Sequence, residues 1–310
     1  MLKYVSVVSF ILWGYFNFFM IQFKGSVEPV NIIFVTFITS LIISFSYTII
    51  SNNSIKHIQI EKKTKILSFF SGIVQSLLYL SYFGFIFMFQ SDTLLIIVFY
   101  YLYGIILIIM DVIIFKTKII LKEYIILFAI SILSIYLIIS TQLSLGKEIN
   151  EFSYYSLLGF IPGFLAALIG VMYKSSNGYK VNNLKELINI NIKLMFYRSI
   201  GALSLVIVYI IVIDKEIDIN RLEIIIGILY GIFNYIIAHS LYTISLYKKI
   251  PMLLVSLFVN ISPIITLIMV FNYTDIPNTI SFKSLIIIII IFILSTFLGI
   301  YHRNKNKINV

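Results

Sequence analysis

Ten runs of about 20 mostly apolar residues follow one another along the 310-residue chain, and they constrain its fold more than any other feature. A run of that length crosses the ~30 Å hydrocarbon layer of a bilayer as an α-helix, whereas a transmembrane β-barrel would show shorter, alternating strands. The predicted fold class is therefore an all-α integral membrane protein with ten transmembrane helices. The expected spans are 4–23, 28–50, 67–89, 93–115, 123–142, 154–173, 194–213, 223–246, 250–272 and 281–301.

The connections between these spans are short, so no extramembrane domain is expected. The longest, 51–66 and 174–193, could form a surface turn or a short interfacial helix. The first span has a single Lys before it and lacks a small-x-small cleavage site, so it is expected to be a retained helix rather than a signal peptide. The chain has no cysteine, which excludes a disulfide framework and a thiol nucleophile.

The distribution of charge predicts the orientation. When loops are assigned alternately to two sides, 17 Lys and Arg residues fall on the side of both termini and 5 on the other side. The positive-inside rule then places both termini in the cytoplasm, with the chain in the cell (inner) membrane. The net charge of +10 is thus an orientation signal, and no nucleic-acid partner is expected.

An internal repeat is visible at an offset of 159 residues, which aligns SGIVQSLLYLSYFGF with YGIFNYIIAHSLYTI without a gap. Gly72 then meets Gly231, and Gln75 meets Asn234. With five helices in each half, residues 1–150 and 151–310, the second repeat must be inserted upside down. Inverted repeats of this kind build transporters whose substrate site lies near the bilayer midplane. Chance alignment of Ile-rich helices is the alternative.

Polar and aromatic side chains near the middle of the spans predict a binding cavity, because polarity at that depth usually faces the bundle interior. Amides supply donors and acceptors, and Tyr or Trp supplies a ring with one polar contact. The alternative is that these amides only join helices by hydrogen bonds. The candidate substrate-binding residues are Trp13, Asn17, Gln75, Tyr79, Tyr101, Asn234, Tyr235, His239 and Asn260.

The eighth span carries two distinct faces. Gly227 and Gly231 lie four residues apart, a small-residue stripe that lets a helix pack closely against a neighbour. Tyr235, His239 and Tyr242 follow at i, i+4 and i+7, which puts them on one adjacent α-helical edge. A helix surrounded by lipid would not tolerate that edge, so it is assigned to an internal cavity.

Two charged residues fall inside the spans, Asp111 and Arg198, each about one turn from the cytoplasmic end. They could form an ion pair or gate, or a proton relay with His239, but snorkelling to the interface is the favoured interpretation. No carboxylate lies at the midplane, so a strongly cationic substrate is not expected. The three histidines are too far apart for a metal cluster, and neither a metal nor a cofactor is expected.

The chain resembles the drug/metabolite transporter superfamily, most closely its EamA-type ten-helix members. The resemblance is carried by FILWGYFNFF at 10–19 and by the block YGIFNYIIAHSLYTISLYKKIPMLLVSLFVNISPIITLIMVF at 230–271, with Pro251 in a short inner loop and Pro263 within the ninth span. The chain departs from the family pattern where Gly104 replaces a Pro, where the inner loop lacks an Ala-rich run, and where Phe115-Lys116 and Tyr273-Thr274-Asp275 stand in place of Gly-Glu.

The resemblance implies a carrier of a small neutral or zwitterionic metabolite such as an amino acid, working by alternating access with export as the expected direction. The expected partners are this small-molecule substrate and membrane lipid, with a homodimer left open. One alternative is an integral membrane enzyme acting on a lipid-linked substrate, although the expected surface cluster of His, Asp and Arg is not obvious. A second is a subunit or scaffold whose polar helix edges bind a partner protein.

Overall fold

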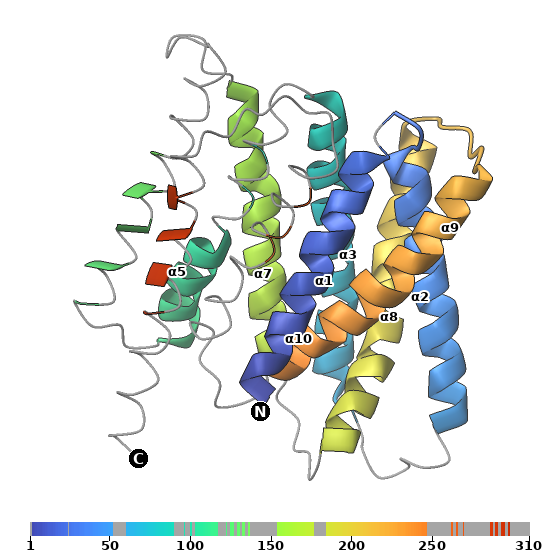
Figure 1. Cartoon of the computed structure of the whole chain (residues 1–310). Coiled ribbons are helices and arrows are strands. Elements are labelled where there is room, and N and C mark those ends of the chain that lie inside the picture. Colours follow the sequence, from blue (N-terminus) through green and yellow to red (C-terminus); the bar gives the residue numbers. More distant parts are fainter. Residues whose placement is uncertain are drawn as a thin grey trace.

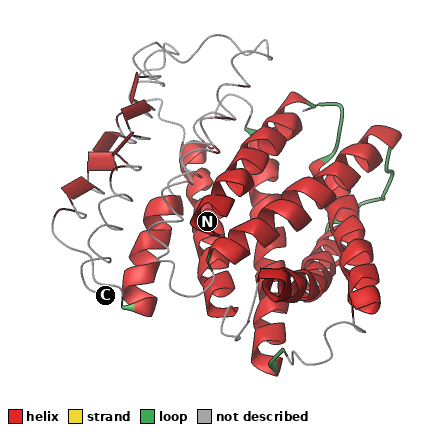
Figure 2. Cartoon of the chain, turned by 60° about the horizontal axis from the view of Figure 1, so that its bottom comes forward, coloured by secondary structure: helices red, strands yellow, loops and turns green. Residues whose placement is uncertain are grey.

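The structure is a computed structural model of the whole chain. It describes residues 2–23, 25–51, 60–89, 96, 100, 103–116, 122, 125–126, 129–130, 132–133, 136, 154–176, 184–246, 262, 265, 269, 286–287, 289–290, 293–294 and 297. The regular secondary structure in this part of the chain is helical, and short turns and loops join the helices, as Figure 2 shows. The prediction of an all-α fold is confirmed.

Ten helical elements are defined within the described ranges. Two are not α-helices: η3 is a 3₁₀-helix and η4 is a π-helix. The elements are α1 (Leu2–Gln22), α2 (Pro29–Ser51), α3 (Lys62–Met88), α5 (Tyr103–Phe115), η3 (Tyr154–Gly159), α7 (Phe160–Ser176), α8 (Leu184–Val212), α9 (Arg221–Leu229), η4 (Tyr230–Ala238) and α10 (His239–Ser245).

Five of the described helices are long and apolar enough to cross a membrane. They cover Pro29–Ile50, Lys62–Met88, Leu157–Ser176, Lys185–Val212 and Arg221–Ser245. Their outward faces carry large apolar side chains, which suits contact with lipid tails better than contact with water. The chain is therefore a membrane protein. The shorter apolar helices α1 and α5 coincide with parts of two further predicted spans.

The helix that contains the seventh expected span begins before that span does. The sequence suggested a surface turn or short interfacial helix through 174–193, but α8 already begins at Leu184. Its first turns are amphipathic: Leu187, Ile190 and Asn191 are buried, while Lys185 is exposed. A mixed charged and apolar stretch can therefore continue a long helix, because only one side of it has to be apolar.

The described helices pack as a bundle in which distant parts of the sequence lie side by side (Figure 1). Helix α8 packs against both α2 and α3, and α3 also packs against α7, which carries α5 on its other side. The continuous run of α9, η4 and α10 crosses the bundle obliquely and contacts α2 and α1.

Several glycines allow close helix contacts, among them Gly72 and Gly231. A Cβ added to Gly72 of α3 would lie 1.9 Å from the backbone oxygen of Arg198 in α8. A Cβ added to Gly231 of η4 would lie 2.9 Å from the backbone oxygen of Thr36 and 3.0 Å from Cβ of Thr39, both in α2. The stripe of small residues predicted in the eighth span thus does serve close packing, and its partner is α2.

One end of the bundle is held by a buried carboxylate. Glu223, in the first turn of α9, forms a reciprocal capping box with Asn220. Its oxygens also accept hydrogen bonds from the backbone N–H of Glu28 at 2.7 Å and from the amide of Asn31 at 3.0 Å. Lys215 pairs with the Glu28 carboxylate nearby. These bonds fix the α1–α2 turn beside the α8–α9 turn.

Candidate functional site

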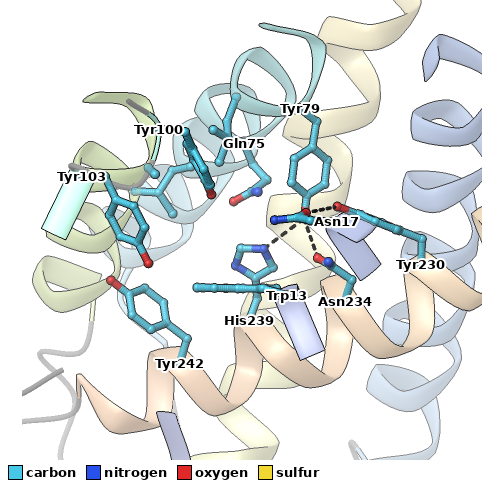
Figure 3. Close-up of a pocket in the computed structure, with 13 residues that line it drawn as sticks. Trp13, Asn17, Gln75, Tyr79, Tyr100, Tyr103, Tyr230, Asn234, His239 and Tyr242 are labelled. Atoms are coloured by element: carbon cyan, nitrogen blue, oxygen red, sulfur yellow. Dashed lines mark hydrogen bonds between the residues drawn. The ribbon is translucent and has the colours of Figure 1, made fainter. Parts of the chain in front are cut away.

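A pocket lies inside the bundle where α1, α3, α5, α7, η4 and α10 meet, and Figure 3 shows its polar side chains turned toward a common space. Its empty space, counted with its opening, is about 410 Å³. The lining is mainly aromatic, and it also holds three side-chain amides and one imidazole. The lining residues are Trp13, Asn17, Gln75, Leu78, Tyr79, Tyr100, Tyr103, Ala166, Ile169, Tyr230, Asn234, His239 and Tyr242.

The pocket brings together six of the nine residues predicted from the sequence to bind substrate. Tyr235 is fully buried behind the wall, with its ring 5.0 Å from that of Phe37 and 5.3 Å from that of His239. Tyr101 and Asn260 lie outside the described residues. The six that line the pocket are Trp13, Asn17, Gln75, Tyr79, Asn234 and His239.

A chain of hydrogen bonds links one side of the pocket. The Tyr79 hydroxyl donates to Oδ1 of Asn234 at 3.0 Å, so its oxygen is left to accept from Nε2–H of His239 at 3.1 Å. The neutral imidazole then has Nδ1 as its acceptor, and the Tyr173 hydroxyl lies 3.3 Å from it. Every donor in this series of hydrogen bonds points the same way, from Tyr173 toward Asn234, so the polar atoms of Tyr79 and His239 are satisfied. We call these four residues the hydrogen-bonded side of the pocket.

The π-helix η4 explains why this side includes residues that an α-helical pattern separates. In an α-helix, positions nine residues apart, such as Tyr230 and His239, face about half a turn away from each other. Hydrogen bonding from i to i+5 widens the turn, so residues four to five apart come into line. Tyr230, Asn234 and His239 consequently all reach the pocket. Tyr230 was not among the residues predicted from the sequence to bind substrate.

The other side of the pocket carries polar atoms without partners. Both amide atoms of Gln75, the indole N–H of Trp13 and the hydroxyl of Tyr242 are buried and make no hydrogen bond in the structure. They come from three helices, α3, α1 and α10, and all three residues line the pocket. Figure 3 shows the Gln75 amide extending into the space above Trp13 and His239. We call these three residues the unmatched side of the pocket.

Arg198 lies one layer behind the pocket and is completely buried. Its guanidinium carbon sits 3.9 Å from the centre of the Tyr173 ring, and Nη1 donates to Oγ1 of Thr243 at 3.2 Å and contacts the sulfur of Met195 at 3.4 Å. Thr243 in turn donates to the backbone oxygen of His239. The favoured interpretation of Arg198 as a snorkelling residue is therefore wrong, because its charged end is enclosed by the protein.

Asp111 is also buried, so the snorkelling interpretation is wrong for it too. Its carboxylate pairs with Nζ of Lys174 at 2.6 Å, which joins α5 to α7. Lys174 follows Tyr173 directly, so the ion pair and the hydrogen-bonded side are attached to the same turn of α7. The sequence grouped Asp111 with Arg198 by depth, whereas helix packing gave it Lys174 as a salt-bridge partner. No group of three or more His, Asp or Glu residues within the described ranges could hold a metal ion.

Comparisons with known proteins bear on the fold and do not identify an activity. No protein-family model matches the sequence, and no curated protein matches it. One solved structure, described only as a crystal structure of a protein, aligns with a TM-score of 0.65 over 96% of this chain and 97% of its own. The two sequences are 13% identical. At that identity the likeness is one of fold alone.

Proposed function

We propose that the protein is a carrier that moves a small neutral or zwitterionic metabolite across the cell (inner) membrane by alternating access, with both termini in the cytoplasm and export as the direction. The observation that carries the proposal is an internal pocket with polar side chains from helices of both halves of the chain, inside a bundle whose outer face is apolar. The resemblance to EamA-type transporters supplies the direction of transport. A soluble solute needs such a polar site only where it leaves water.

Contacts at the crossing of α2 and α8 support an inverted repeat. The hydroxyls of Ser40 and Ser199 lie 2.7 Å apart, and these two residues are separated by 159 positions, the offset that aligns the two halves. A residue that touches its own counterpart lies on a local two-fold axis. The proposed repeats are residues 1–150 and 151–310.

The glycine contacts follow the same symmetry. Gly72 packs on Arg198, and Gly231 packs on Thr39. The offset between the glycines is 231 − 72 = 159, and that between their partners is 198 − 39 = 159, the same separation as in the serine pair. Helix α3 thus sits on α8 as η4 sits on α2.

The place of the pocket supports alternating access. Its walls come from α1, α3 and α5 in one half and from α7, η4 and α10 in the other. A rocking movement of one repeat against the other would therefore open the pocket to either side of the membrane in turn. The Asp111–Lys174 pair and the buried Arg198 lie at the edges of this pocket-forming layer, and we assign them to coupling or gating of that movement.

A ligand screen on the purified full-length chain tests the proposal. Amino acids, nucleosides, sugars, polyamines and quaternary amines are added to the detergent-solubilised protein, and the midpoint of thermal unfolding is measured. A solute that binds the native state raises the midpoint by mass action. We expect at least one neutral or zwitterionic class to do so, and we expect Asn234→Ala to abolish the shift.

Asn191→Ala is the matched control, since Asn191 is a buried amide on α8 that bonds the backbone of its own helix, at Leu187, and does not line the pocket. A hit is then loaded into proteoliposomes, where a carrier gives counterflow of labelled solute. Silence of the whole panel with a well-folded protein would contradict the carrier and favour an enzyme acting on a lipid-linked substrate. Co-purification of a stoichiometric protein after mild solubilisation would favour a scaffold.

A further inference from the structure

The two sides of the pocket differ in how many of their polar atoms form hydrogen bonds. On the hydrogen-bonded side every polar atom of Tyr79 and His239 has a partner. On the unmatched side, Trp13, Gln75 and Tyr242 bury hydrogen-bonding atoms that have none. Leaving such atoms unpaired in a protein interior is costly, so buried polar groups normally find a partner. Three of them facing one pocket indicate that the missing partner is a ligand.

The available atoms define that partner. Trp13 can only donate, Gln75 can donate and accept, and Tyr242 can do either. The complementary group must therefore offer at least two acceptor atoms close together. A carboxylate, a carboxamide and a phosphate each meet this requirement, so hydrogen bonding alone does not choose among them.

The charge behind the pocket distinguishes between these three groups. Nε and Nη2 of Arg198 have no hydrogen-bond partner, and the contacts of its guanidinium are with uncharged groups of Tyr173, Thr243 and Met195. Lys174 does not add to this charge, because Asp111 neutralises it. Within the described lining of the pocket there is no carboxylate. Among the described residues, the buried positive charge of Arg198 therefore stands next to the pocket without a compensating anion, a costly state that a bound anion relieves.

The charge reaches the pocket through two short connections. The Arg198 guanidinium stacks on Tyr173, whose hydroxyl contacts His239, and it donates to Thr243, which is bonded to the His239 backbone. His239 lines the pocket and its ring lies 4.8 Å from that of Trp13. In a region of low dielectric constant, a buried positive charge behind the wall of a pocket favours an anion over a neutral group. One guanidinium matches one negative charge, so a monoanionic carboxylate fits better than a phosphate.

We propose that the pocket recognises solutes that carry a carboxylate, which is held by Trp13, Gln75 and Tyr242 and is favoured by the uncompensated charge of Arg198. This inference rests on the proposed carrier function and specifies its substrate class. It excludes neutral sugars and nucleosides, which the proposed function alone would leave to the screen.

The test compares matched pairs of probes on the full-length detergent-purified protein. Leucine, glutamine and phenylalanine are each measured beside their carboxamides, which keep the amine and side chain but lack the carboxylate. We expect the acids to bind at least about tenfold more tightly than the amides, the effect of a charged hydrogen-bonded group. Amides that bind as tightly as the acids would overturn the inference.

Conservative variants test whether the preference for the acids comes from the named residues. Trp13→Phe and Tyr242→Phe keep a ring and remove one polar group each. We expect each to weaken the acids several-fold and the amides by less, because a hydrogen bond to a charged acceptor is the stronger one. Arg198→Met should reduce the preference for the acid to about twofold, and Arg198→Lys should restore part of it. Ser68→Ala is the control, because Ser68 is a buried α3 residue with an unmatched hydroxyl that does not line the pocket.

The outcomes separate this inference from the carrier itself. If Arg198→Met does not fold, the two aromatic variants still decide, and a preference that survives both of them overturns the assignment. If acids and amides are silent while a nucleoside or sugar binds in an Asn234-dependent way, the carrier stands and the carboxylate inference falls. If every class is silent, both fall together.

Discussion

Helix α3 and the run formed by η4 and α10 occupy equivalent positions in the proposed repeats, yet they serve the pocket in different ways. Helix α3 is a regular α-helix that carries Gln75, whose amide has no partner. The opposite run is π-helical over nine residues and carries Asn234, whose amide oxygen accepts from Tyr79. One amide is thus fixed by the protein, and its counterpart is left open. The comparison suggests that the hydrogen-bonded side of the pocket is held by the protein and that the unmatched side is available to a ligand.

The irregular helix belongs to the rigid wall, which has a physical reason. A π-helix is rare because its wide turn packs its own backbone less well, so it persists where other contacts stabilise it. Here Tyr230, Asn234 and His239 gain a common face, and the ring of Tyr230 lies 5.6 Å from that of Tyr79. The hydrogen-bonded side of the pocket therefore depends on the helix irregularity. Helix α3 needs no such irregularity because Gln75 and Tyr79, four residues apart, already share an α-helical face.

The largest effect on stability is expected where Gly72 of α3 packs against α8. Gly72→Ala places a methyl group against the backbone of Arg198 and should destabilise the protein by about 3 kcal/mol or prevent folding, since overpacking against backbone is not relieved by a rotamer change. Gly231→Ala, at the equivalent place in η4, meets longer contacts and should cost less, about 1 kcal/mol.

Thermal unfolding and the yield of monodisperse protein measure this difference. Gly84→Ala is the control, because an added Cβ there meets nothing within 4 Å. It should match the parent protein, or gain slightly from helix propensity. Equal losses for Gly72→Ala and Gly231→Ala would mean that the two seats are equally tight, which would contradict the difference between them.

An effect of intermediate size should distinguish the amides of Asn234 and Gln75, because removing the first should lower stability and removing the second should not. Asn234→Leu removes the acceptor of Tyr79 and should lower the free energy of unfolding by about 1 kcal/mol. Gln75→Met removes a buried amide that has no partner, so stability should stay the same or rise. Both variants are measured without ligand by thermal or denaturant unfolding.

A ligand assay on the same two variants sharpens the contrast. Gln75→Met should still lose affinity for the solute that the parent protein binds, which shows stability and binding moving apart. A loss of stability from Gln75→Met as large as that from Asn234→Leu would show that Gln75 is held by the protein. The unmatched side would then lose one of its three groups.

The smallest effect is expected at the contact between the halves. Removing either hydroxyl of the Ser40 and Ser199 pair should cost about 0.6 kcal/mol, the average for a hydrogen bond between membrane helices. Ser40→Ala, Ser199→Ala and the double variant form a cycle, in which the double variant should lose little more than either single one. Strictly additive losses would mean that the two serines do not interact.

Ser204→Ala provides the control for that cycle, because its hydroxyl bonds only to the backbone of Gly201 in its own helix. Combined with Ser40→Ala, it should give additive changes. The two cycles together therefore separate a bond between the proposed repeats from a general response to loss of a serine.

The sequence by itself determined the class of fold and six of the thirteen residues that line the pocket. Long apolar runs admit helices in a bilayer and little else, because backbone groups in lipid must be satisfied within the segment. Polar residues in such runs have to face the protein, so Trp13, Asn17, Asn234 and His239 could be selected without coordinates. The glycine stripe of the eighth span was equally legible, since close helix packing requires small side chains.

Only the tertiary structure decided which polar groups meet and which stay unmatched. Periodicity assumes about 3.6 residues per turn, so it placed Tyr235 in the cavity, whereas the π-helix puts Tyr235 behind the wall and Tyr230 in the lining. Depth along a span grouped Asp111 with Arg198, but helix packing gave Asp111 to Lys174 and buried Arg198 under Tyr173. A hydrogen bond or ion pair depends on contacts between helices far apart in sequence, and those are fixed only when the helices pack.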